Sequence, residues 1–219
     1  MSPYIVIVLC CIAAYLIGSC NSAIIVVKLL KHEDVREFGS KNAGLTNVLR
    51  CFGKGPALAT LIADLLKGCL TILIIKAVVK ASGFTGDIMT VAYIAGLLVL
   101  LGHVFPVWYG FKGGKGVLVT ATVLLAIDPL TFAIVIPVFI IMLVITKYVS
   151  VSSITAAIAY PIVTFIVQYF AKHMELSSVL VHTGFAALSG VLIVYMHRAN
   201  IKRLMDGTEN KFSFSKNKK

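Results

Sequence analysis

The residues best suited to chemistry lie in a polar stretch between two apolar runs. From Gly39 to Asn47 the chain reads GSKNAGLTN, and Arg50 follows shortly after. Two glycines, one serine, one threonine and two amides permit a tight backbone whose N–H groups converge, and Lys41 and Arg50 add positive charge. These are the requirements of an anion pocket, although an ordinary polar loop with Asx turns has the same composition.

A second stretch combines glycines with a lysine. From Gly102 to Val117 the chain reads GHVFPVWYGFKGGKGV, so Lys115 stands among three glycines where an apolar run begins. Backbone donors, a helix N-terminus and an ammonium group can then face one phosphate. A Walker A loop is excluded because Gly116 follows Lys115 where Ser or Thr is required. A flexible hinge with a lipid-facing lysine explains the stretch equally well.

Two further polar regions border apolar runs. Ser150, Ser152 and Ser153 precede one run, and serines at such a position are typical helix caps. His197 and Asn200 follow the last run three residues apart, so they share a helix face and can reach one ligand. A basic membrane anchor would explain the neighbouring Arg and Lys residues but has no need of these two side chains.

The elements that must position these residues are membrane helices. The chain has 219 residues, of which 59% are hydrophobic and 13% charged, whereas soluble domains carry about 25% charged residues. Backbone polar groups inside lipid must be paired locally, so the apolar runs are expected to be helices. We predict an all-α integral membrane protein with seven transmembrane helices, near residues 3–30, 56–80, 88–108, 116–127, 130–146, 153–171 and 177–196.

The distribution of charge orients these helices. With the N-terminus outside, 16 of the 20 Lys and Arg residues lie on the inner side, and the outer loops hold three, at Lys76, Lys80 and Lys172. The positive-inside rule therefore predicts a cytoplasmic C-terminus, and it accounts for the net charge of +11 without nucleic acid binding. We predict one polytopic membrane domain over 1–219. Its parts are a membrane core 1–204, cytoplasmic loops 31–55, 109–116 and 147–153, and a basic cytoplasmic tail 205–219.

The segment 116–127 is the weak point of the count, since its 12 residues rise only about 18 Å as a helix. Asp128 and Pro129 favour a turn after it, so we predict a short or partly re-entrant span. Inside the second run, Asp64 and Lys67 share one helix face, where they either pair with each other or belong to the site. Gly18 and Ser22 form a small-residue stripe typical of helix packing.

Taken together, the four polar regions resemble the bacterial acyl-phosphate-dependent glycerol-3-phosphate acyltransferase family called PlsY. The first region is similar to the motif GSGNxGATN, with departures at Lys41 and Leu45, and the second matches its motif from Gly102 to Val117 throughout. The region from Tyr148 to Ile154 follows as the third. The fourth, from His197 to Glu209, is similar to HRxNIxRLxxGxE. The resemblance covers nearly the whole chain.

This resemblance implies transfer of a fatty acyl group from acyl phosphate to glycerol 3-phosphate, giving lysophosphatidate and phosphate without acyl-CoA or acyl carrier protein. It implies no cofactor, no metal and no obligate protein partner, and it places the enzyme in the bacterial cytoplasmic membrane, among membrane lipids, with its active site on the cytoplasmic side. Carried over residue by residue, the expected catalytic residues are Lys115, His197, Arg50 and Asn200. The expected substrate-binding residues are Ser40, Asn42, Gly44, Thr46, Asn47, His103, Gly113, Gly114 and Ser153.

An acyl phosphate already carries a good leaving group, so direct attack by the glycerol hydroxyl suffices. Lys115 and Arg50 would stabilise the departing phosphate, and the base is either His197 or a substrate phosphate. The alternative function is a membrane transporter of phosphorylated metabolites. Transporters often show broken helices near mid-membrane in two related halves, whereas here the polar residues gather at one surface.

Overall fold

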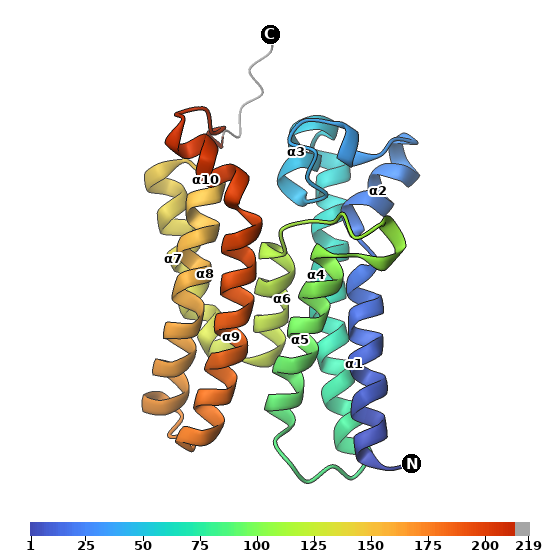
Figure 1. The fold of residues 1–219 in the computed structure, drawn as a ribbon, viewed down its shortest axis with the longest axis vertical. Helices are drawn as coiled ribbons and strands as arrows, with labels where there is room; N and C mark the ends of the chain where they lie inside the picture. Colours follow the sequence, from blue (N-terminus) through green and yellow to red (C-terminus); the bar gives the residue numbers. More distant parts are fainter. Residues whose placement is uncertain (213–219) are drawn as a thin grey trace. The chain divides into compact units, whose positions relative to one another are not determined.

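The computed structural model describes residues 1–212, and every regular element within them is a helix (Figure 1). The prediction of an all-α chain is therefore confirmed for this part. The fold divides into two compact units, Met1–Pro129 and a second that begins at Leu130, and each is described by itself. Of the predicted basic tail, residues 213–219 lie outside the described residues.

The first unit contains six α-helices and two short 3₁₀ turns. They are α1 (Pro3–Ser19), α2 (Ser22–Lys31), η1 (Val35–Glu37), α3 (Leu45–Phe52), α4 (Lys54–Ala81), α5 (Ile88–Val104), η2 (Val107–Tyr109) and α6 (Val117–Ile127). In Figure 1, α2, α3 and the loop after α5 lie at the same end of this unit.

The first apolar run is broken, which the sequence analysis did not predict. Between α1 and α2 the axis bends by 41°. The bend ends in a cap, because the Asn21 side chain accepts a hydrogen bond from the N–H of Ile24. The Asn21 amide also donates to the carbonyl of Ala43, 3.3 Å away. This break therefore ties the first membrane helix to the first polar stretch.

Small residues bring α1 and α5 into close contact. A side chain on Gly18 would collide with the backbone of Val99, and one on Gly102 would collide with the backbone of Tyr15. The Tyr15 hydroxyl donates to the Phe105 carbonyl at 2.9 Å, which joins the two helices near the start of the second polar stretch. Gly18 thus serves helix packing, as its spacing predicts.

The second unit contains α7 (Pro129–Thr146, which begins at the boundary), α8 (Val149–Ile166), the π-helical turn η3 (Val167–Ala171), α9 (Leu176–Met196) and α10 (Arg198–Met205). Here α8 packs on α9 through small residues. A Cβ on Gly190 would lie 2.5 Å from the Ala157 carbonyl oxygen. This contact fixes the two helices whose ends carry the third and fourth polar regions.

Among the described residues, five helices are long and apolar enough to cross a membrane, or six if the bent pair α1–α2 counts as one crossing. The predicted segments match these helices to within a few residues at most ends. The helix α6 has 11 residues and rises only about 16 Å, as expected of the shortest predicted segment. It packs against α4 and α5 in the first unit.

Candidate active site

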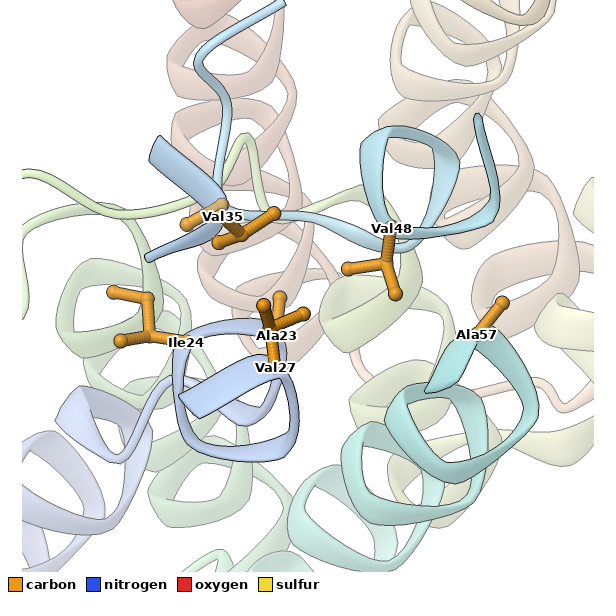
Figure 2. Close-up of a cluster of buried hydrophobic side chains, with 7 residues drawn as sticks. Ala23, Ile24, Val27, Val35, Val48 and Ala57 are labelled. Carbon is orange, nitrogen blue, oxygen red and sulfur yellow. The ribbon is translucent and has the colours of Figure 1, made fainter. Parts of the chain in front are cut away.

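The first polar stretch is built on its own apolar core. Buried side chains from α2, η1, the stretch itself, α3 and α4 form one cluster: Ala23, Ile24, Val27, Val35, Ala43, Val48 and Ala57 (Figure 2). On α3, Leu45, Leu49 and Phe52 pack against this cluster, while Arg50 is exposed. The sequence analysis expected an irregular loop here, and α3 shows that its second half is an amphipathic helix.

Asn47 holds the stretch in shape. Its side chain is 2% exposed. Its Oδ1 accepts from the N–H of Ser40 at 3.0 Å, and its amide donates to the carbonyls of Val35 and Phe38 at 3.1 and 3.0 Å. Asn47 therefore links three backbone groups of the segment 35–40 through its side chain. These contacts shape the loop, whereas the sequence analysis expected Asn47 to bind substrate.

The backbone explains why the family pattern has glycine at the position that Lys41 occupies here. Lys41 has φ = +56°, the left-handed region that glycine adopts without strain. The pattern has glycine at this position, so the replacement keeps the conformation at a small conformational cost. The Lys41 side chain is exposed, and it adds a cation beside Ser40 and Asn42.

The second polar stretch runs against the end of α5. The N–H groups of Gly113 and Gly114 donate to the carbonyls of Val104 and His103, at 3.2 and 3.1 Å. These two N–H groups are therefore already paired with backbone carbonyls, whereas the first N–H groups of α6 have no partner within the helix. A Cβ on Gly114 would collide with the His103 ring and lie 2.7 Å from the Ala43 oxygen.

Side chains join the two stretches within the first unit. The Arg36 guanidinium donates to the carbonyl of Tyr109 at 2.9 Å and to that of Lys112 at 3.4 Å. Asp34 holds the same guanidinium at 2.7 Å, and this hydrogen-bonded pairing lowers the pKa of the Asp34 carboxyl. Gly114, next to Ala43, provides the second point of contact. The structure thus brings the first and second regions together.

A buried polar cluster lies behind Gly114. The Lys67 ammonium is 3.1 Å from Asp64 Oδ1, 3.2 Å from His103 Nδ1 and 3.2 Å from the carbonyl oxygen of Cys20. The side chains of Asp64, Lys67 and His103 are 2%, 7% and 4% exposed. The predicted pairing of Asp64 with Lys67 is confirmed, and the pair contacts a residue of the second polar stretch.

In the second unit, His197 and Asn200 are buried at the junction of α9 and α10. His197 Nδ1 lies 2.8 Å from the Ile193 carbonyl oxygen. A carbonyl only accepts, so Nδ1 carries the hydrogen and the neutral ring keeps its lone pair on Nε2. The Asn200 amide donates to Glu209 Oε1 at 2.6 Å, and Arg203 Nε donates to Glu209 Oε2 at 2.7 Å.

The third and fourth regions also meet within this unit. Phe212 N–H donates to the Lys147 carbonyl at 2.7 Å, so the described part of the tail folds back to the start of α8. Burial tends to raise the pKa of Glu209, but the hydrogen bonds from Asn200 and Arg203 outweigh it and lower that pKa. The serines of this region do not cap α8, because Ser152 and Ser153 donate to the carbonyls one turn earlier.

The remaining predicted residues are accessible to different degrees. Ser40 is exposed, while Asn42, Gly44, Thr46 and Lys115 are half-buried. Ser153 is buried in the first turns of α8. Within residues 1–212, no group of three His, Cys, Asp or Glu side chains is arranged to hold a metal ion.

Comparison with known proteins identifies the family. A family model described as glycerol-3-phosphate acyltransferase matches residues 8–207. The chain belongs to the glycerol-3-phosphate acyltransferase family. A relative of that name from Chlorobaculum parvum is 42% identical, over 93% of this chain and 95% of its own length. One from Chlorobaculum tepidum is also 42% identical, with coverages of 94% and 96%.

The crystal structure of PlsY (YgiH), an integral membrane glycerol 3-phosphate acyltransferase, is also similar. Its glycerol 3-phosphate form has a TM-score of 0.78 and 35% identity, over 94% of this chain and 96% of that one. Its lysophosphatidic acid form has a TM-score of 0.77 and 34% identity. The resemblance to PlsY is thereby confirmed, and the chain is a multi-pass membrane protein of the acyltransferase family.

Sequence reasoning missed two residues that organise this member of the glycerol-3-phosphate acyltransferase family. Arg36 joins the two stretches of the first unit. The only indication in the sequence that its guanidinium is held in place was the nearby carboxylate of Asp34. Glu209 holds Asn200, and its place at the end of the family's fourth motif was a usable signal. Neither residue type stands out in a charged loop without coordinates.

Proposed function

We propose that this protein transfers a fatty acyl group from acyl phosphate to glycerol 3-phosphate, giving lysophosphatidate and inorganic phosphate. The similarity over 94% of the chain to PlsY in a glycerol 3-phosphate form and a lysophosphatidic acid form carries the proposal. The first compound would be the acceptor, and the second the acylated product. An acyl phosphate is a mixed anhydride, so the acceptor hydroxyl can displace phosphate without an acyl-enzyme.

The first unit offers the cations for this reaction. Lys115 precedes Gly116, the N-cap of α6, and Arg50 lies in the last turn of α3. Arg36 donates to the Tyr109 carbonyl of the second stretch, and Gly114 of that stretch lies next to Ala43 of the first. Fixed positive charge stabilises the phosphate as its negative charge grows in the transition state. We assign Ser40, Asn42, Gly44 and Thr46 to substrate binding beside these cations, with Gly113 and Gly114 providing room for the backbone to approach.

We assign His197, Asn200 and Ser153 of the second unit to the same reaction. Hydrogen bonding at Nδ1 leaves the His197 lone pair on Nε2, as a general base requires. A phosphate of the substrate is the other candidate base. Glu209 accepts a hydrogen bond from the Asn200 amide and so fixes its orientation.

We further propose seven crossings, with the N-terminus outside, the C-terminus in the cytoplasm and the reaction at the cytoplasmic face of the bacterial inner membrane. The excess of Lys and Arg in the proposed inner loops and tail supports this orientation. In this topology α6 is one of the crossings although it is short, and its packing against α4 and α5 holds it within the bilayer.

Purified protein in detergent, given a long-chain acyl phosphate and labelled glycerol 3-phosphate, tests the proposal. Labelled lysophosphatidate and an equal amount of phosphate are expected without any added protein. Acyl-CoA offered in place of acyl phosphate should give no product. Failure with acyl phosphate, combined with uptake of labelled glycerol 3-phosphate into proteoliposomes, would replace the proposal with the transporter function.

A further inference from the structure

The Lys67 ammonium donates hydrogen bonds to two groups and forms an ion pair with a third. The partners are Asp64 Oδ1, the Cys20 carbonyl and His103 Nδ1, all at 3.1 to 3.2 Å. An ammonium group has no lone pair, so each partner must accept. His103 Nδ1 is therefore the acceptor, and the neutral ring carries its hydrogen on Nε2.

The alternative arrangement of the ring is disfavoured. A hydrogen on Nδ1 would point at the N–H groups of Lys67, and the nearest other acceptor, Asp64 Oδ1, is 4.0 Å away, beyond hydrogen-bond distance. Asp64 also compensates the buried charge of Lys67, which would otherwise be costly inside the membrane. The two charged residues together fix which nitrogen of His103 is the donor.

The donor nitrogen faces the second polar stretch. His103 Nε2 and the Ala43 oxygen both lie beside Gly114, next to the position that a Cβ would occupy. No hydrogen bond to Nε2 occurs among residues 1–212, although the residue is only 3% exposed. The Nε2 atom therefore lies where the two stretches meet, beside Gly114, the residue before Lys115.

We propose that Lys67, anchored by Asp64 and the Cys20 carbonyl, is a positioning residue that keeps His103 in one tautomer, so that its Nε2–H donates to the phosphate bound beside Gly114. This inference rests on the proposed function, because it adds a donor to that phosphate site. His103 would then bind substrate directly, whereas Asp64 and Lys67 act through it.

Nitrogen NMR of protein labelled with ¹⁵N-histidine tests the tautomer, with His103→Gln used to assign the signal. We expect His103 Nδ1 to be unprotonated and Nε2 to carry the hydrogen, and the Nε2 signal to shift when glycerol 3-phosphate is added. A hydrogen on Nδ1 in the unaltered protein would overturn the proposal. This spectrum needs no turnover, so it decides even if a variant fails to fold.

Kinetics of the double variant Asp64→Asn/Lys67→Met test the consequence. Removing both charges leaves no unpaired buried ion, so the protein should fold with a similar melting temperature. The KM for glycerol 3-phosphate should rise at least about tenfold, the effect of losing one oriented hydrogen bond to an anion, with a smaller change in kcat. The control is Lys76→Met on the same helix, whose ammonium donates to the Ala126 carbonyl, and it should leave KM unchanged.

Two further results complete the test. His103→Gln places an amide N–H near the position of Nε2 and should retain more activity than His103→Phe. A double variant with unchanged KM and an unchanged His103 tautomer would reject the positioning role. If the unaltered protein shows no acyl transfer, the proposed function fails; if it is active but His103 carries its hydrogen on Nδ1, only this inference fails.

Discussion

The half-buried Lys115 is the residue on which the proposed chemistry depends most. It precedes Gly116, the N-cap of α6, so its ammonium and the first N–H groups of that helix can act on one phosphate. Lys115→Ala should lower acyl transfer by about 10² or more, the scale of losing one charge-stabilising group. The exposed Lys112→Ala, three residues earlier, is the control. Near-normal turnover of the Lys115 variant in purified enzyme would remove this residue from the mechanism.

His197 makes a separate prediction about pH. A base must be neutral to accept a proton, so the rate should rise with pH as His197 loses its proton. His197→Ala should lose this limb of the pH–rate profile, whereas His173→Ala, at the loop before α9, should retain it. An unchanged profile shape in the His197 variant would assign the base to the substrate phosphate.

Glu209 makes a prediction about stability. Its folded pKa lies below the ordinary 4.5, so its ionised form stabilises the folded protein above that pH, and this contribution is lost as the pH falls through the folded pKa. Glu209→Gln should lower the melting temperature near pH 7 by about 5 °C, since it weakens charge-assisted hydrogen bonds to Asn200 and Arg203. The difference between the two proteins should begin to close below the ordinary pKa and should vanish below the folded pKa.

Thermal unfolding in detergent between pH 7 and pH 3 measures this difference. Glu33→Gln, an exposed carboxyl in the first unit, should show no comparable loss. If the Glu209 variant were less stable than the unaltered protein by the same amount at every pH, the shape of the side chain would account for the loss and its charge would not.

At the scale of elements, the position of the second polar stretch depends on glycine at residue 114, where there is no room for a side chain. A methyl group on Gly114 would meet both the His103 ring and the Ala43 oxygen, which lie on different elements. Gly114→Ala should therefore separate the two stretches and raise the KM for glycerol 3-phosphate by about tenfold, while Gly55→Ala, where a Cβ meets open space, should be neutral. Equal KM values for the two variants would contradict this packing argument.

The elements also show what the sequence could predict. Long apolar runs required helices because lipid offers no other partner for the backbone, and their ends were found from charges and prolines. The break at Asn21 and the helix α3 were missed, since both depend on contacts with Ala43 and with the cluster around Val48. Within the site, the residue types indicated a phosphate pocket. The sequence did not show which N–H groups of the glycine stretch are already paired, because that depends on the path of the backbone.

At the scale of the whole molecule, the prediction concerns topology. In a protein with its five native cysteines replaced, a cysteine at the exposed Leu130, next to the turn that ends α6, should react with a membrane-impermeant reagent from outside intact cells. A cysteine at Lys112 should react only after the membrane is opened. Protection of the Leu130 position in intact cells would make α6 re-entrant and reverse the predicted side of the C-terminus.

The fold-back of the tail has a consequence for genetics. The hydrogen bonds from Asn200 to Glu209 and from Phe212 to Lys147 come from residues beyond every apolar helix. A stop codon after Gly207 would spare all segments that insertion machinery reads, so the shortened polypeptide should reach the bilayer in normal amounts. It should nevertheless fail to support growth where this enzyme is essential, a null allele that protein-level detection alone would overlook.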